Sequence, residues 1–276
     1  MRLFSKSTPE LTDDQLERQH LLSAQSDFFL QEAFKTLRTN VMFSLTEESK
    51  CKVITVTSSM VGEGKSYTAS NLALSFKMMD KRVLLIDCDL RRPKLSRLLQ
   101  LNSPIGLTNV LMEPTHMKEA LLVYGDIGLE VILSGSIPPN PSELLGSKRM
   151  ETLLGALKGS YEYIILDAPP INMVTDAAIL SNISSGVLFV VRASRADQRG
   201  VQHAITQLEY ANAKILGFVL NGVNAESGGY GYKRYGYRRY GYGYKRYGYH
   251  QYGYGYQASQ NHSASPIAQG IQPKND

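Results

Sequence analysis

A glycine-rich segment that ends in lysine and serine is the clearest sign of chemistry in the sequence. It reads Ser59-Met-Val-Gly-Glu-Gly-Lys-Ser66 and lies between an apolar run typical of a strand and a helical run that begins at Tyr67. In this setting glycines let backbone N–H groups surround phosphates, and the N-terminus of the helix favours their negative charge. Lys65 could reach the β- and γ-phosphates of a nucleotide, and the hydroxyl of Ser66 could bind Mg²⁺. The segment therefore predicts a phosphate-binding loop, although Ser59 stands where the general pattern has glycine.

We assign nucleotide binding to this whole loop and to the residue after it. The assigned residues are Ser59, Met60, Val61, Gly62, Glu63, Gly64, Lys65, Ser66 and Tyr67. The alternative is a glycine-rich turn that contains Gly-Lys-Ser by chance, and the flanking strand and helix argue against it.

Three aspartates follow two other apolar runs. Asp87 and Asp89 come directly after residues 83–86, and Asp167 follows residues 163–166. Residues at i and i+2 of an extended segment point the same way, so Asp87 and Asp89 could both face a metal–phosphate cluster. An acid at the carboxyl end of a strand is also well placed to hold a water molecule bound to magnesium. Each acid alone could be a solvated cap at a strand end, but three such placements around one crevice favour a shared site.

These residues need a scaffold that brings several loops to one edge. Apolar runs typical of buried strands occur at residues 53–56, 83–86, 129–133, 163–166, 187–191 and 215–220. They alternate with helical stretches near residues 66–79, 143–158, 174–184 and 197–211. Buried strands separated by helices predict an α/β domain of the P-loop NTPase type, with a mostly parallel sheet and helices on both faces. Such sheets bind ligands at the carboxyl ends of their strands.

The chain divides by composition into a lead-in, a domain and a tail. Residues 1–26 are polar and predict a loosely held lead-in, residues 27–224 predict the folded domain, and residues 225–276 predict a disordered tail. Of the 17 tyrosines, 12 lie between Tyr230 and Tyr256. Residues 228–256 also hold six lysines and arginines and no acid, so removing these six charges from the formal +5 leaves −1 for the rest. The body is therefore neutral, and only the tail is basic.

Nothing in the sequence indicates a membrane span or a secretion signal. The longest apolar runs, residues 83–86 and 187–191, are far shorter than the roughly 20 residues that a spanning helix needs. The first ten residues lack an apolar stretch and a small-residue cleavage site. We therefore expect a cytoplasmic location, where Cys51 and Cys88 would be buried free thiols without a chemical role.

In several motifs the chain resembles the bacterial tyrosine kinases of capsule and exopolysaccharide synthesis. The shared motifs are Gly62-x-Gly64-Lys65-Ser66, Asp87-x-Asp89-x-Arg91-Arg92-Pro93, Asp167-x-Pro169-Pro170, Pro138-Pro139-Asn140-Pro141-x-Glu143-Leu144-Leu145, Leu220-Asn221 and the tyrosine cluster. The resemblance covers roughly residues 27 to 256. It implies a P-loop protein-tyrosine autokinase that uses ATP and Mg²⁺ and phosphorylates its own tail.

The resemblance also implies a role for each site residue. Lys65 and Ser66 would hold phosphates and Mg²⁺, and Asp89 and Asp167 would position the metal. Asp87 would act as the base that takes the proton of a tyrosine hydroxyl, whose pKa of about 10 keeps it neutral at pH 7. Asn221 would belong to the nucleotide site. The residue patterns alone do not rank Asp87 above Asp89 as the base.

The implied phosphoacceptors are the tyrosines of the tail. They are Tyr230, Tyr232, Tyr235, Tyr237, Tyr240, Tyr242, Tyr244, Tyr247, Tyr249, Tyr252, Tyr254 and Tyr256. A flexible spacer that happens to be aromatic is the alternative, which so strong a concentration of tyrosine makes implausible. We expect phosphorylation between chains.

A helix predicted over residues 27–45 carries Glu32-x-x-Lys35-x-x-Arg38, which resembles the family's self-association motif. The motif implies a homo-oligomeric ring, and an ordinary surface helix is the alternative. Lys35 replaces the family's arginine and lacks its bidentate guanidinium, so the contact should be weaker. A second departure is Tyr67, where the family has threonine, and we expect Tyr67 to affect packing more than metal binding.

The family acts with a membrane activator of the polysaccharide co-polymerase type and with a tyrosine phosphatase. The chain resembles the split form of these kinases, in which the membrane part is a separate protein that recruits the kinase to the inner face of the cell membrane. Two other functions remain. A partitioning or cell-division-type ATPase switch would carry a lysine where Met60 stands, and a nucleic-acid-binding protein would use the basic Tyr/Gly/Arg tail. No nucleic-acid partner is expected, because the neutral body continues no basic groove.

Overall fold

The computed structural model describes residues 18–45 and 50–223, and these residues form a seven-stranded sheet. Its strands are β1 (Lys52–Ser58), β2 (Val83–Asp87), β3 (Leu121–Tyr124), β4 (Leu129–Ile132), β5 (Tyr163–Asp167), β6 (Gly186–Arg192) and β7 (Ile215–Asn221). Their order in the sheet is β3-β4-β2-β5-β1-β6-β7. All neighbouring pairs are parallel except β3 with β4. The predicted α/β fold with a mostly parallel sheet is confirmed.

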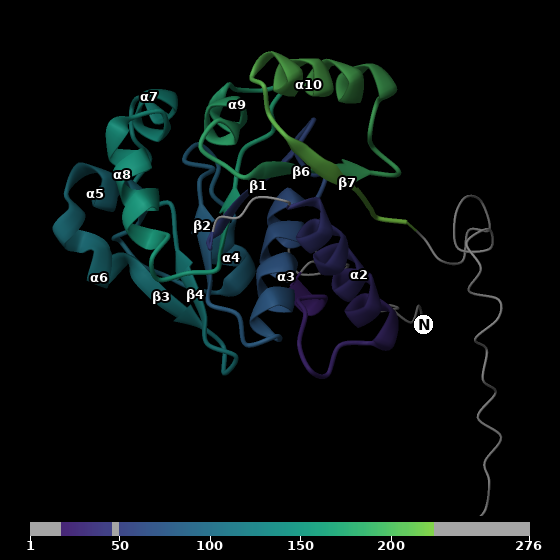
Figure 1. Cartoon of the computed structure of the whole chain (residues 1–276), viewed down its shortest axis with the longest axis horizontal. Coiled ribbons are helices and arrows are strands. Elements are labelled where there is room, and N and C mark those ends of the chain that lie inside the picture. Colours follow the sequence, from purple (N-terminus) through teal and green to yellow (C-terminus); the bar gives the residue numbers. More distant parts are fainter. Residues whose placement is uncertain (1–17, 46–49, 224–276) are drawn as a thin grey trace, which may run out of the picture. The chain divides into compact units, whose positions relative to one another are not determined.

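Helices cover both faces of this sheet (Figure 1). They are α2 (Phe28–Ser44), α3 (Lys65–Lys77), α4 (Leu95–Leu99), α5 (Leu107–Met112), α6 (Met117–Ala120), α7 (Pro141–Leu145), α8 (Lys148–Leu157), α9 (Asp176–Ser181) and α10 (Gln198–Tyr210), with a 3₁₀ turn at Pro114–His116. No helix among the described residues combines the length and apolar character needed to cross a membrane.

Alternate residues of the buried strands feed two apolar cores, one on each face of the sheet. On β2, Leu84 and Ile86 pack in the core that includes α5, α8, α9 and α10, while Leu85 packs in the core that includes α2, α3 and α4. This period of two follows from the pleat, which points successive side chains to opposite faces. Because both faces are covered, β2 is apolar up to Asp87 at its end, as the sequence predicted.

Two predicted elements differ from the observed ones. The helical stretch near residues 143–158 is two helices, because the chain turns at Gly146 and the side chain of Ser147 accepts the N–H of Met150 to start α8. The run at residues 215–220 was predicted to be buried, but Phe218 and Leu220 are 55% and 60% exposed. β7 is the last strand in the sheet order, so its far edge has no neighbouring strand among the described residues.

The lead-in differs from the loose segment that we predicted, as far as residues 18–26 describe it. Leu21 and Leu22 are buried, and the N–H of Leu22 donates to Asn71 Oδ1 of α3 over 2.6 Å. The side chain of Asp27 then accepts the N–H groups of Phe29 and Leu30 and caps α2. The tail and all twelve predicted phosphoacceptors lie outside the described residues.

Candidate functional site

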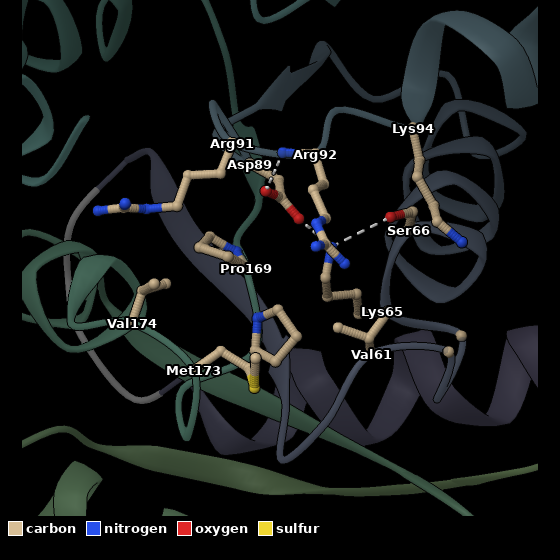
Figure 2. Close-up of a pocket in the computed structure, with 13 residues that line it drawn as sticks. Val61, Lys65, Ser66, Asp89, Arg91, Arg92, Lys94, Pro169, Met173 and Val174 are labelled. Atoms are coloured by element: carbon tan, nitrogen blue, oxygen red, sulfur yellow. Dashed lines mark hydrogen bonds and ion pairs between the residues drawn. The ribbon is translucent and has the colours of Figure 1, made fainter. Parts of the chain in front are cut away.

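A pocket of about 250 Å³ opens at the carboxyl ends of the central strands. Three segments line it: Val61 to Ser66 after β1, Asp89 to Lys94 after β2, and Pro169 to Val174 after β5 (Figure 2). These strands are adjacent in the order β2-β5-β1, so the parallel topology brings the three segments together. The segments are the ones in which the sequence predicted a phosphate loop and the two acidic motifs.

The phosphate loop depends on two glycines in left-handed backbone conformations. Gly62 and Gly64 have φ angles of 84° and 91°, which residues other than glycine rarely adopt. A Cβ atom on Gly64 would also lie 2.0 Å from Nδ2 of Asn221. Gly64 is the N-cap of α3 and has no side chain to accept the first N–H groups of that helix. The start of α3 is therefore suited to bind an anion.

Lys65 lies at the centre of the polar residues. Its Nζ is 2.9 Å from Asp89 Oδ2, 3.4 Å from Ser66 Oγ and 3.6 Å from Asp167 Oδ1. All four side chains are buried. Burial alone would lower the pKa of Lys65, but the charges of Asp167 and Asp89 raise it above its usual value. The ammonium therefore stays protonated and balances the carboxylates.

The residues predicted to bind metal are suited to a hard divalent cation. Neither carboxylate oxygen of Asp167, which is fully buried, has a hydrogen-bond partner in the described part of the chain. Burial raises the pKa of Asp167, an effect that the nearby Lys65 opposes. Ser66 and Asp89 add a hydroxyl and a second carboxylate, and Mg²⁺ prefers such oxygen ligands together with water and phosphate oxygens. Residues 18–45 and 50–223 contain no cluster of three His, Cys, Asp or Glu side chains arranged to hold a metal.

Asp87 lies behind the pocket. The sequence predicted that Asp87 and Asp89 could both face the bound phosphates, but only Asp89 is among the lining residues. The carboxylate of Asp87 accepts the N–H of Asp89 over 3.1 Å and the N–H of Leu95 over 3.2 Å. Burial and the charge of Asp167 raise the pKa of Asp87 well above its usual range. Asp87 therefore shapes the turn after β2.

Four of the nine residues assigned to nucleotide binding do not line the pocket with their side chains. Glu63 turns back into the loop, where its Oε2 accepts hydrogen bonds from the hydroxyl of Ser59 over 2.8 Å and from the N–H of Met60 over 2.7 Å. Tyr67 packs edge-on against Phe34, and its hydroxyl donates to the carbonyl of His20 over 3.1 Å. Glu63, Ser59, Met60 and Tyr67 therefore stabilise the loop and its surroundings, and Tyr67 acts in packing as the sequence suggested.

Sequence reasoning missed the partner of Arg91. This arginine binds Asp176 at the start of α9, with Nε 3.0 Å from Oδ2 and Nη2 3.1 Å from Oδ1, and its Nη2 is 2.8 Å from Ser142 Oγ. Asp176 is fully buried, and its Oδ1 also accepts a hydrogen bond from the hydroxyl of Ser142 over 2.7 Å. The contacts join the segment after β2 to α7 and α9. Arg91 and Asp176 are 85 residues apart, so no local sequence pattern indicates that they pair.

Asp176→Ala is expected to lower the free energy of unfolding by about 2 kcal/mol, because it leaves Arg91 and Ser142 without their shared acceptor. For a domain of this size the melting temperature should fall by roughly 4–8 °C. Glu151→Ala is the control, since Glu151 pairs with exposed Lys148 and should contribute under about 0.5 kcal/mol. Equal melting temperatures for the two variants would contradict the assignment.

The three residues of the predicted self-association motif make different contacts within the chain. Glu32 and Lys35 form a surface pair with 2.7 Å between Oε1 and Nζ. Arg38 instead turns towards α3, where its Nη1 donates to the carbonyl oxygen of Ser75 over 2.5 Å. Arg38 therefore joins α2 to α3 within the chain, whereas Glu32 and Lys35 pair with each other at the surface.

Known proteins match most of the folded part of the chain. A family model described as an AAA domain matches residues 51–216. The tyrosine-protein kinase YwqD of Bacillus subtilis is 39% identical over 206 residues, which cover 73% of this chain and 86% of that protein. The tyrosine-protein kinase CpsD of Streptococcus agalactiae is 38% identical over 210 residues, which cover 75% and 90%. The solved kinase domain of the Escherichia coli tyrosine kinase ETK has 33% identity and a TM-score of 0.68, with coverage of 74% of this chain and 80% of that chain.

Proposed function

The chain belongs to the bacterial tyrosine-protein kinases of capsule and exopolysaccharide synthesis, and we propose that it transfers the γ-phosphoryl group of Mg·ATP to the tyrosines of its own tail. The observation that carries this proposal is the meeting of Lys65, Ser66, Asp89 and the segment after β5 at one pocket. A kinase site needs a cation for the phosphates, oxygen ligands for magnesium and room for an acceptor.

Each side chain has a proposed role in phosphoryl transfer. Lys65 binds the β- and γ-phosphates, and the N–H groups of the loop and of α3 surround them. Ser66, Asp89 and Asp167 would hold Mg²⁺, which would neutralise charge that builds up on the phosphates. Asp87 takes the proton of the tyrosine hydroxyl, and Asp89 is the second candidate for this base because it lines the pocket.

The apolar wall of the pocket suits an aromatic acceptor. Five apolar residues line the pocket: Val61, Pro169, Pro170, Met173 and Val174. Of these, Pro169, Met173 and Val174 lie across the pocket from Ser66 and Lys94 (Figure 2). A tyrosine ring could pack on this wall while its hydroxyl reaches towards the phosphates, an arrangement that orients the nucleophile without a covalent step. We therefore propose that these five residues favour tyrosine over the shorter serine and threonine.

We propose that transfer occurs between chains and acts as a switch on assembly, regulating polysaccharide synthesis and export. About thirty residues of glycine-rich chain have an r.m.s. reach of roughly 30 Å, enough to visit a neighbouring site. Each phosphotyrosine adds about −1.5 to −2 charges, so about four would offset the six basic side chains of residues 228–256. Further phosphates would make neighbouring tails repel each other. A membrane activator would recruit the kinase to the membrane, and a tyrosine phosphatase would reverse the switch.

Transfer between chains is tested by mixing two variants. The acceptor is the full-length Lys65→Met chain, and the donor is an active chain truncated after Asn224, together with Mg·ATP and the activator. We expect phosphotyrosine on the full-length chain, because only it carries the tail. No label on the full-length chain, with wild-type labelling at a rate independent of dilution, would show transfer within one chain.

Glu32→Ala is expected to weaken self-association of the dephosphorylated protein, because Glu32 and Lys35 form the surface pair of the motif on α2. Light scattering across a dilution series would report the mass. Glu209→Ala, at an exposed position of α10, is the control. The proposed α2 interface fails if the Glu32→Ala and Glu209→Ala variants dissociate at the same concentration as the wild type.

A further inference from the structure

Two side chains from neighbouring strands hold the phosphate loop from outside the pocket. Arg192 ends β6 and Asn221 ends β7, and the two are register partners in this parallel pair. Nη1 of Arg192 donates to the carbonyl oxygen of Gly62 over 3.0 Å. Nδ2 of Asn221 donates to the carbonyl oxygen of Glu63, also over 3.0 Å. The two bonds therefore end on consecutive carbonyl groups of the loop.

The direction of these carbonyl groups matters for binding phosphate. In a planar trans peptide the C=O and the N–H point in opposite directions. Fixing the carbonyl groups of Gly62 and Glu63 on Arg192 and Asn221 therefore turns the N–H groups of Glu63 and Gly64 to the other side of the loop. A loop of this kind binds phosphate with such N–H groups. Neither Arg192 nor Asn221 is among the described residues that line the pocket.

The loop is also fixed from within. The carboxylate of Glu63 accepts two donors from the start of the loop, Ser59 Oγ and the N–H of Met60. Asn221 lies so close that Gly64 has no room for a side chain. Contacts inside the loop and contacts from β6 and β7 thus set one backbone arrangement, which lowers the ordering cost when a polyphosphate binds.

We propose that Arg192 is a positioning residue of the nucleotide site: through the carbonyl of Gly62 it aims the N–H groups of the phosphate loop at a polyphosphate that it does not touch. Asn221, which sequence resemblance assigned to the nucleotide itself, has the same indirect role at Glu63. The inference rests on the proposed nucleotide site and adds to it two residues that act through the backbone of the loop.

The test compares full-length wild type with Arg192→Met and Arg192→Lys. Arg199→Met is the matched control, because Arg199 is an exposed arginine on α10. Calorimetry gives the Kd of Mg·ATP and of inorganic triphosphate, a probe that carries the phosphates without the base. Steady-state phosphorylation gives the KM for ATP and the kcat.

Arg192→Met is expected to raise the Kd of both Mg·ATP and triphosphate by about tenfold, which is the effect of losing a hydrogen bond from a charged donor. KM should rise by a similar factor while kcat changes little, because the loop binds ground state and transition state alike. Arg192→Lys keeps a charged donor and should recover part of the affinity, and Arg199→Met should match the wild type. If Arg192→Met does not fold, Asn221→Leu, which removes the second donor at nearly constant size and adds no charge, should show the same loss.

Three results would overturn the inference. One is an unchanged Kd for triphosphate in Arg192→Met, or in Asn221→Leu if that variant replaces it. Another is a fall in kcat at constant KM, which would place Arg192 in the chemical step. The third is wild-type protein that binds neither ATP nor triphosphate, which would remove the proposed nucleotide site as well and so differs from the first two.

Discussion

Lys65→Met is expected to reduce tyrosine phosphorylation of the chain by at least about a hundredfold, the usual cost of removing one group that stabilises charge in a transition state. The ammonium of Lys65 lies 2.9 Å from Asp89 and 3.6 Å from Asp167, at the centre of the polar part of the pocket. Methionine keeps an unbranched apolar stem but has no charge to offer the phosphates. Phosphotyrosine on the full-length chain and the Kd for Mg·ATP are the measurements.

The control for this substitution must separate chemistry from folding. Removing the ammonium leaves buried carboxylates without a cation, so some loss of stability is expected and melting curves should accompany the activity data. Lys77→Met makes the same change at the end of α3, outside the pocket, and should phosphorylate normally. A folded Lys65→Met chain with undiminished phosphotyrosine would contradict the assigned role.

Asp87→Asn and Asp89→Asn are each expected to lower phosphoryl transfer by orders of magnitude, but for different reasons. Asp89 lines the pocket and binds Lys65, so its loss should also raise the Kd for Mg·ATP. Asp87 lies behind the pocket and accepts two backbone N–H groups, so Asp87→Asn should better preserve nucleotide affinity. If both variants lose nucleotide binding equally, Asp87 is not the base, and its role is to hold the turn that carries Asp89.

The parts of the site that the sequence could predict are those in which a short motif follows a strand. The glycines of the phosphate loop indicate a backbone conformation that other residues rarely adopt, and the observed φ angles of Gly62 and Gly64 agree. Asp89 and Asp167 follow apolar runs typical of buried strands, and the fold places both near Lys65. Their chemical roles stay predictions.

Other features depend on partners that are far away in the sequence. The bonds of Arg192 to Gly62 and of Arg38 to Ser75 depend on how strands and helices pack, and no spacing rule reveals them. Arg38 shows the consequence: the motif suggested a contact with a neighbouring chain, and the structure adds a hydrogen bond from Arg38 to α3 of the same chain, which the spacing could not reveal. The edge position of β7 was missed for the same reason, because its apolar run resembles those of the central strands.

The location of phosphate on the chain tests the central claim most directly. Peptide-mapping mass spectrometry of the full-length protein, isolated from its own cells with phosphatases inhibited, would show which residues carry phosphate. We predict several phosphotyrosines between Tyr230 and Tyr256 in the wild type and none in Lys65→Met. An unmodified wild-type tail, or the same tail phosphotyrosines in both proteins, would contradict autophosphorylation by this site.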